Sequence, residues 1–292
     1  MVSVIIINYN TLRLTKLCIE SVIAKTSISY EIIVVDNAST EGNVDELKIL
    51  FPGIKLIKNN CNLGFAKGNN IGMSYATGDY VLLLNSDTIL ITNAIDQAYE
   101  KIVSDPAIGV LSAQLISPDG SIQNASNEQG TIFKSLGRAF RLHHLFNYFK
   151  PPLNNLSREH PTDWIWGTFF FFPLYIIKLF PEQKLHEDFF MYNEDKQWCY
   201  FIKNKLKKKI VYYPEAKISH LISASSRIND ESKYLQKILP NDYKFLCLCH
   251  SNLYALCYYL SIGLFYLLNF KKSSLIKARF YTEFAWKSFI QH

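Results

Sequence analysis

The sequence predicts an α/β protein with a mainly parallel sheet, followed by a helical C-terminal region. Two patterns lead to this prediction. Over residues 1–115, short β-branched runs alternate with amphipathic stretches of helical length, which is typical of right-handed βαβ units. The expected strands are almost entirely apolar, as strands are when helices cover both faces of a sheet. With 292 residues and 49% hydrophobic side chains, the chain can bury a sizeable core.

Local patterns place each element. Strands are expected at residues 2–9, 30–35, 54–57, 80–84 and 109–116, and helices at 11–25, 44–51, 66–76 and 94–103. Further along, strands are expected at 164–172, 209–213 and 217–220, and a helix at 194–204. Residues 125–162 are polar and aromatic with two adjacent prolines, so we expect a mobile irregular loop over a site.

The C-terminal region combines apolar and basic residues. Residues 245–270 are the most hydrophobic stretch of the chain, and Lys271 and Lys272 follow directly. Polar residues interrupt this stretch, so it favours an interfacial helix or hairpin on an anionic membrane surface. A transmembrane span and a buried core helix stay open as alternatives. The formal net charge is +6, but no nucleic-acid-binding signature occurs, so we expect no nucleic-acid partner.

The cysteines and the first residues indicate an intracellular protein. Six cysteines show neither a CxxC pair nor the spacing of a disulfide framework, so reduced thiols are expected. Met1 leads into an apolar run without a basic segment, which is unlike a signal peptide.

Polar side chains end several expected strands, among them Asn8, Asp36, Asn59 and Asp87. Ligands bind beyond the carboxyl ends of strands in sheets of this kind. Asp87 is therefore a candidate ligand of a divalent cation, and Asp36 a candidate contact of a ribose or a base. Each of these acids has an alternative role as the cap of a following helix.

Residues 62–72 contain three glycines at four-residue spacing. Such spacing lets the backbone approach a phosphate-bearing ligand and then lets a helix pack closely. Lys67 is placed to reach the phosphates, and Asn69 or Asn70 to offer neutral hydrogen bonds. Neither GxGxxG nor GxxxxGK[ST] occurs in the chain, which disfavours a dinucleotide-dependent dehydrogenase and a P-loop NTPase.

Two acids open the helix expected at 194–204. In the pair Glu194 and Asp195, one carboxylate can orient a hydroxyl while the other removes its proton. Like charge and apolar neighbours would raise one of the two pKa values. The alternative is that both acids only complement the helix dipole. His220 ends an expected strand and is a candidate metal ligand, although a lone histidine is more often structural.

Taken in order, these segments resemble glycosyltransferase family 2, and most closely its rhamnosyltransferase-like branch, which builds bacterial O-antigen, capsule or cell-wall linkers. The matching segments lie within residues 2–225, at 4–10, 33–39, 62–72, 83–87, 166–167, 190–195 and 213–220. The resemblance implies a GT-A fold over residues 1–225, with a nucleotide-sugar-binding half at 1–115 and an acceptor and catalytic half at 116–225. Residues 226–292 would form a helical membrane-associating region.

The resemblance also implies inverting transfer from a nucleoside-diphosphate sugar with Mg²⁺ or Mn²⁺. Asp195 matches the catalytic base and Glu194 its acidic neighbour. Asn85 stands where the family usually has the first acid of its Asp-X-Asp motif, which leaves Asp87 and His220 as metal ligands. The implied nucleotide-sugar-binding residues are Asn8, Asn10, Asp36, Asn37, Lys67, Gly68, Asn69, Asn85, Ser86, Trp166 and Gly167.

L-Rhamnose carried on dTDP is the donor first expected from the resemblance, with a polyprenyl-diphosphate-linked or glycan acceptor. The expected location is the cytoplasmic face of the membrane. A sugar nucleotidyltransferase is one rival, but residues 8–13 lack the glycine-rich loop that such enzymes usually carry after the first strand. A non-catalytic scaffold of a polysaccharide assembly complex is the other.

Overall fold

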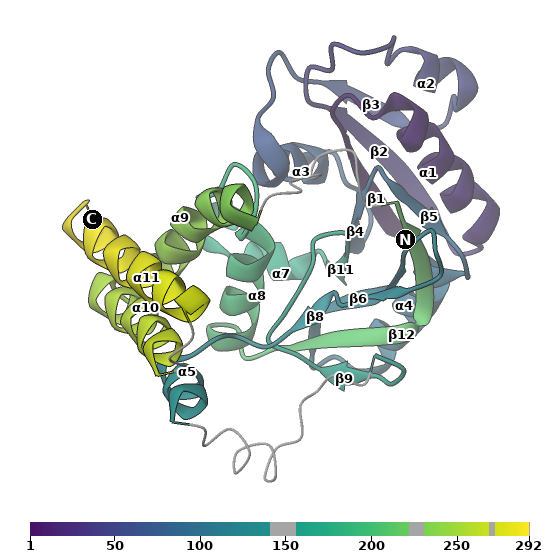
Figure 1. Ribbon diagram of the computed structural model, residues 1–292. Helices are drawn as coiled ribbons and strands as arrows, with labels where there is room; N and C mark the ends of the chain where they lie inside the picture. The colour runs from purple at the N-terminus through teal and green to yellow at the C-terminus, as the bar shows by residue number, and fades with distance from the viewer. Residues whose placement is uncertain (141–155, 222–230, 269–271, 292) are drawn as a thin grey trace. The chain divides into compact units, whose positions relative to one another are not determined.

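The computed structural model describes residues 1–140, 156–221, 231–268 and 272–291 (Figure 1). The chain forms two compact units. The α/β unit comprises residues 1–127 and 156–227, and the helical unit comprises 128–155 and 228–292. The predicted boundary near residue 225 lies close to the second crossing between the units. Residues 128–155, which the sequence groups with the first region, belong to the helical unit.

The first part of the sheet is parallel. Strands β1 (Val2–Asn8), β2 (Tyr30–Asp36), β3 (Lys55–Lys58) and β4 (Tyr80–Asn85) lie in the order β3-β2-β1-β4. The register pairs Asn8 with Asp36 and Ile7 with Asn85. The polar residues that end these strands therefore lie along one edge of the sheet, as the sequence predicted.

The second part of the sheet is mixed, which corrects the prediction of a mainly parallel sheet. Strand β11 (Phe169–Pro173) runs antiparallel between β4 and β6 (Ile108–Ile116). Strand β12 (Lys209–His220) is parallel to β6 and antiparallel to β5 (Thr88–Leu90). Local apolar patterns do not encode strand direction, so the insertion of β11 was not foreseen.

Helices cover both faces of this sheet (Figure 1). Helices α1 (Leu12–Lys25) and α4 (Ala94–Ser104) pack on one face, against strand residues such as Val4 and Ile6. Helices α3 (Gly64–Ser74) and α8 (Glu194–Asn204) pack on the other face, against Ile5 and its neighbours. The remaining short elements of this unit are α2 (Glu46–Leu50), β7 (Ile122–Gln123), β8 (Ser126–Asn127), β9 (His160–Pro161), β10 (Trp164–Ile165), α7 (Tyr175–Lys178) and the 3-10 turn η1 (Pro181–Gln183).

Three expected elements differ in the structure. The strand expected at 164–172 is split into β10 and β11 by residues 166–168. The two strands expected around Pro214 form the single strand β12, whose register shifts between Tyr213 and Lys217 so that the proline is accommodated. The expected irregular segment 125–162 contains helix α5 (Ile132–Ala139) and two short strands, and its residues 141–155 lie outside the described part.

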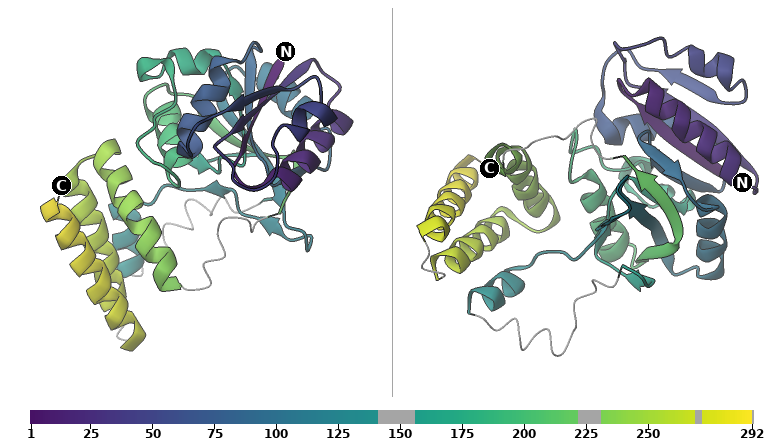
Figure 2. Two further views of the ribbon diagram at one scale, coloured as in Figure 1. Left: turned by 90° about the horizontal axis from the view of Figure 1, so that it is seen from above. Right: turned by 45° about the vertical axis from the view of Figure 1, so that its right-hand side comes forward.

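The helical unit contains α5, α9 (Glu231–Cys249), α10 (Asn252–Leu267) and α11 (Lys272–Gln291), and α10 and α11 lie side by side (Figure 2). Tyr243, Tyr259 and Phe284 form an aromatic cluster between the last three helices, with ring centroids 5.2–6.0 Å apart. The apolar stretch 245–270 is not one helix, because Ser251 caps α10 by accepting a hydrogen bond from the Tyr254 N–H. Within the described ranges, none of the helices combines the length and hydrophobicity that crossing a bilayer requires.

Candidate active site

A buried hydrogen-bond network joins the ends of β1 and β2. The Asn8 amide nitrogen donates to Asp36 Oδ1 at 2.6 Å and to Ser39 Oγ at 3.0 Å. Its amide oxygen accepts from the hydroxyls of Thr11 and Thr15. Ser39 also donates to Asp36 through both its hydroxyl and its backbone N–H. Asn8 and Asp36 are both buried, so this network gives the rim of the sheet a fixed shape.

Asn10 and Asn37 hold the two loops that follow these strands. Asn10 has a left-handed backbone (φ 54°), and its side-chain oxygen accepts from the N–H groups of Thr40 and Glu41. Asn37 is buried, and its amide donates to the carbonyl of Gly64 at 3.1 Å. The loop after β2 is thereby tied to the start of the glycine-rich helix.

The glycines of α3 allow close packing. A Cβ on Gly64 would lie 2.4 Å from the carbonyl oxygen of Phe190, and one on Gly68 would lie 3.1–3.2 Å from Ile7 and Asn37. Asn69 is buried and its amide donates to the carbonyl of Phe65, one turn earlier in α3, whereas Lys67 is exposed. The structure therefore shows the close helix packing that the glycine spacing predicts. Contact of this segment with a phosphate stays a prediction.

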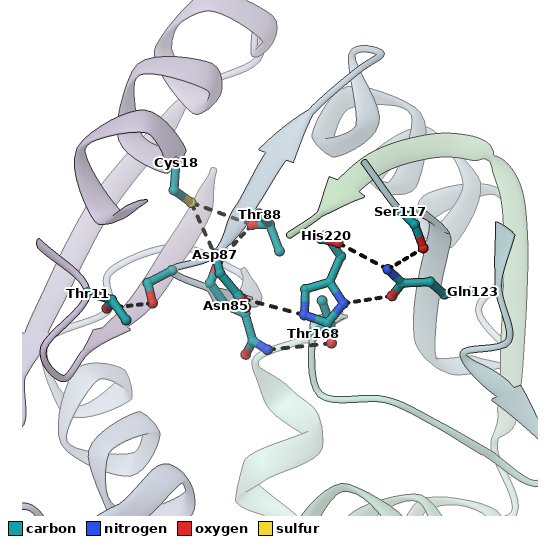
Figure 3. Close-up of polar contacts among 10 residues, drawn as sticks. Thr11, Cys18, Asn85, Asp87, Thr88, Ser117, Gln123, Thr168 and His220 are labelled. Atoms are coloured by element: carbon teal, nitrogen blue, oxygen red, sulfur yellow. Dashed lines mark hydrogen bonds and ion pairs between the residues drawn. The ribbon is translucent and has the colours of Figure 1, made fainter. Parts of the chain in front are cut away.

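Asp87 and His220 face each other at the carboxyl edge of the sheet (Figure 3). Asp87 follows β4, and His220 ends β12, where it pairs with Thr88 of β5. Asp87 Oδ1 lies 3.5 Å from His220 Nε2, and the side chains are 18% and 10% exposed. A carboxylate oxygen and an imidazole nitrogen suit a divalent cation such as Mn²⁺. In the described part of the chain, no cluster of three or more His, Cys, Asp or Glu side chains could hold a metal ion.

Asn85 is fixed beside this pair (Figure 3), and hydrogen bonds also hold the neighbouring Ser86. The backbone N–H of Asn85 donates to the carbonyl of Thr168 at 3.1 Å, and its side chain reaches the Thr168 hydroxyl at 3.5 Å. The Ser86 hydroxyl lies 2.9 Å from that of Thr11. The segment after β4 is therefore anchored on both sides.

Glu194 and Asp195 open α8, as predicted, and they differ in their surroundings. Asp195 is partly accessible and accepts from the N–H groups of Gly167 (2.9 Å) and Lys196 (2.7 Å). Glu194 is buried, and among the described residues its Oε2 atom finds no hydrogen-bond partner.

These surroundings affect the pKa values of the two carboxyl groups differently. Burial and the charge of Asp195 raise the pKa of Glu194 to about 8. Burial also raises the pKa of Asp195, but two backbone donors oppose that rise by stabilising its ionised form. Of the two groups, Asp195 is therefore the one whose ionised form the surrounding N–H donors stabilise.

Residues 166–168 connect these groups. The Trp166 ring lies edge-on to His220, with centroids 6.5 Å apart. The Gly167 N–H bonds Asp195, and Thr168 bonds Asn85. A Cβ at residue 167 would come within 2.9 Å of the Phe65 ring, so any side chain there would force that ring to shift. One short segment thus holds the carboxylate pair and the Asp87–His220 pair in a single site.

Sequence reasoning missed several residues of this site. Thr11, Thr168 and Gln123 belong to it through hydrogen bonds alone, and none of them lies in a segment that sequence pattern singles out as functional. Gln123 sits on a two-residue strand, and its Oε1 atom is 2.8 Å from His220 Nδ1.

The chain resembles several known glycosyltransferases. It is 31% identical over 111 residues to an uncharacterised glycosyltransferase of Haemophilus influenzae, which covers 38% of this chain and 37% of that protein. It is 29% identical over 210 residues to Agl10 of Haloferax volcanii, a low-salt glycan biosynthesis hexosyltransferase, which covers 68% of this chain and 60% of that protein. The chain thus spans less than two thirds of each of these relatives.

Two solved structures share the fold. The 1–349 fragment of TarS from S. aureus superposes with a TM-score of 0.57 at 16% identity, covering 99% of this chain and 80% of the fragment. GalNAc-T7, crystallised with UDP, GalNAc and Mn²⁺, superposes with a TM-score of 0.60 at 17% identity, covering 84% of this chain and 48% of that one. These likenesses identify the mixed sheet as a GT-A-like fold.

Residues 3–175 match the model of the family described as glycosyl transferase family 2, which is more than half of the sequence. With the fold in agreement, the chain belongs to glycosyltransferase family 2.

Proposed function

We propose that this protein transfers a sugar from a nucleoside-diphosphate donor to an acceptor hydroxyl, with inversion at the anomeric carbon. The observation that carries this proposal is the junction at residues 166–168. It holds the carboxylate of Asp195, which accepts two backbone hydrogen bonds, in the same site as a carboxylate–imidazole pair, Asp87 and His220. Family membership supports a nucleotide-sugar donor, and so does the UDP present in two structural neighbours, GalNAc-T7 and the TarS fragment in its complex with UDP.

Asp195 acts as the general base. It takes the proton of the acceptor hydroxyl, and the oxygen attacks the anomeric carbon opposite the leaving diphosphate. Glu194 stays protonated beside it and prevents a second charge from building up in the pocket. Gly167 donates to one carboxylate oxygen of Asp195 and fixes its direction. General-base catalysis of this kind contributes about 10²–10⁴-fold to the rate.

The donor set of Asp87 and His220 fits a divalent cation, and its nitrogen ligand favours Mn²⁺ over Mg²⁺. When bound, such a cation neutralises negative charge on a diphosphate leaving group. Asn85 and Ser86 keep Asp87 in place through Thr168 and Thr11. Lys67, exposed on α3, is proposed to add positive charge toward the same diphosphate.

The donor and the acceptor follow from resemblance. We keep dTDP-L-rhamnose as the first donor to test, and UDP-linked sugars stand beside it because two neighbours were crystallised with UDP. The proposed acceptor is a polyprenyl-diphosphate-linked sugar or a growing surface glycan. The relative from Haloferax volcanii is named for a role in glycan biosynthesis, which supports a glycan acceptor.

A donor screen tests this function. Purified protein with Mn²⁺ receives dTDP-rhamnose, UDP-glucose, UDP-galactose, UDP-GlcNAc or GDP-mannose together with a lipid-diphosphate sugar, and nucleoside-diphosphate release is followed. Release with one donor, dependent on the acceptor, is the expected result. No release with any donor, combined with no thermal stabilisation by any nucleotide, would instead support the non-catalytic scaffold.

We also propose that the helical unit binds an anionic membrane surface, at the cytoplasmic face where the lipid-linked acceptor would be found. This unit contains 12 basic and 5 acidic residues. It exposes large apolar side chains on α5 and α11, including Phe133 (84%), Ile276 (66%) and Ile290 (68%). Apolar side chains within a basic surface are suited to the boundary between headgroups and acyl chains. Co-sedimentation with phosphatidylglycerol vesicles, but not with pure phosphatidylcholine vesicles, is the expected result.

A further inference from the structure

We infer that Gln123 is a positioning residue that fixes the tautomer of His220 and thereby keeps the Asp87–His220 pair open for a cation. This inference deepens the proposed function and rests on its cation site. Gln123 lies on β7, is buried, and pairs with Leu115 of β6. It contacts His220 on two sides, through the imidazole and through the backbone (Figure 3).

The hydrogen bonds of Gln123 determine which way its amide points. Its nitrogen donates to the carbonyl oxygen of His220 and to the hydroxyl of Ser117, each at 3.0 Å. A backbone carbonyl only accepts, so the NH₂ group must be on that side. Oε1 therefore faces His220 Nδ1 at 2.8 Å. Because Oε1 also only accepts, Nδ1 must carry the hydrogen.

The consequence lies on the opposite edge of the ring. In a neutral imidazole with hydrogen on Nδ1, Nε2 presents a lone pair. That lone pair faces Asp87 Oδ1 at 3.5 Å, and the carboxylate oxygen is an acceptor as well. Two acceptors at this distance repel each other unless a cation lies between them. In the other tautomer, Nε2–H would donate to Asp87, and Nε2 would have no lone pair available for a metal ion.

Neither glutamate nor leucine reproduces this arrangement. Glutamate at position 123 would keep an acceptor for Nδ1–H but would set a carboxylate against the His220 carbonyl oxygen. Leucine would leave Nδ1–H and that carbonyl oxygen without their present partners in a buried place. Partners of this type orient metal-binding histidines, and their loss costs about 10–100-fold in metal affinity.

Mn²⁺ binding, followed by the electron paramagnetic resonance of free Mn²⁺ with and without UDP, is the first test. We expect Gln123→Leu to weaken Mn²⁺ binding by about 10–100-fold and Gln123→Glu to weaken it less. Gln114→Leu is the matched control, because Gln114 is equally buried but bonds Leu156 and Tyr212 instead. Wild-type-like Mn²⁺ affinity in a folded Gln123→Leu variant would overturn the inference and leave the proposed function standing. No Mn²⁺ binding by the wild type would overturn the cation site and the inference together.

The tautomer itself is measured on the wild type, so the test does not depend on whether a variant folds. In metal-free protein labelled with ¹⁵N-histidine at pH 8, two-bond ¹H–¹⁵N correlations report which ring nitrogen is protonated. The His220 signal is assigned by its loss in His220→Asn. We expect hydrogen on Nδ1 in the wild type and a shift toward the Nε2–H form in Gln123→Leu. A wild-type signal from the Nε2–H form would contradict the inference.

Discussion

The α/β unit holds 19 basic and 20 acidic residues, whereas the helical unit holds 12 basic and 5 acidic ones, so the net positive charge of the chain belongs to the sequence of the helical unit. The α/β unit gathers its polar groups at the carboxyl edge of its sheet and bonds them to one another. The helical unit instead exposes large apolar side chains and has an excess of basic residues in its sequence. Under the proposed function, this difference assigns chemistry to the α/β unit and membrane binding to the helical unit. Substitutions in one unit should then leave the other unit's function unchanged.

Asp87→Asn should have the largest effect. Removing the carboxylate takes away one of the two proposed cation ligands, so we expect turnover to fall about 10²–10³-fold, as when one electrostatic stabiliser is lost. Mn²⁺ binding should weaken in parallel, while vesicle binding stays unchanged. Asp105→Asn serves as the control, because Asp105 lies in the same unit and pairs with Lys209 and the Ala107 N–H instead of with His220. A normal turnover of Asp87→Asn would remove Asp87 from the site.

Gly64→Ala should lower the free energy of unfolding of the α/β unit. Gly64 has φ +81°, where a side chain costs about 1–2 kcal/mol. Its new methyl group would also meet the Phe190 carbonyl, and overpacking of this kind costs about 1–3 kcal/mol more. Gly120→Ala separates the two costs, because Gly120 has φ +84° but open space around it. Equal losses of unfolding free energy in urea for the two variants would refute the packing role of Gly64.

Glu194→Gln should change how stability depends on pH. The carboxyl group titrates near 4.5 when unfolded and at about 8 when folded. Between these values the folded state binds the extra proton, so the free energy of unfolding falls as pH rises, by at most about 1.4 kcal/mol per pH unit. The variant should flatten this slope in urea titrations from pH 5 to 8. Glu46→Gln is the control, because Glu46 pairs with Lys16 at the surface, and it should keep the wild-type slope. A wild-type slope in Glu194→Gln would show that Glu194 does not hold the proton.

Ile290→Ser should affect attachment alone. Ile290 is 68% exposed on α11. Replacing it should weaken binding to phosphatidylglycerol vesicles roughly tenfold, because the free energy lost corresponds to burying part of one large apolar side chain in the membrane. Ile49→Ser is a matched control, because Ile49 is 76% exposed on α2 of the α/β unit. Equal vesicle binding by both variants, or a loss of turnover on a soluble acceptor in Ile290→Ser, would contradict the separation of the two functions.

Local sequence patterns predicted the parts of the site that depend on local structure. The polar ends of β1, β2 and β4 were recognised because apolar strands stop there, and α8 begins at Glu194 as expected. Strand direction was not predictable, since β11 enters the sheet antiparallel through pairing with residues far away in sequence. Gln123 and Thr168 carry no local signal, because their roles arise only when β7 meets His220 and residues 166–168 meet Asn85.

Turnover of Asp195→Asn, measured beside its nucleotide binding, tests most directly whether the α/β unit is a transferase with Asp195 as its base. We predict that turnover with the best donor falls about 10²–10⁴-fold. The affinity for the corresponding nucleoside diphosphate and Mn²⁺ should stay at the wild-type value, because among the described residues Asp195 accepts from the N–H groups of Gly167 and Lys196 and does not contact Asp87 or His220. Unchanged turnover in a folded Asp195→Asn protein would contradict the proposed mechanism.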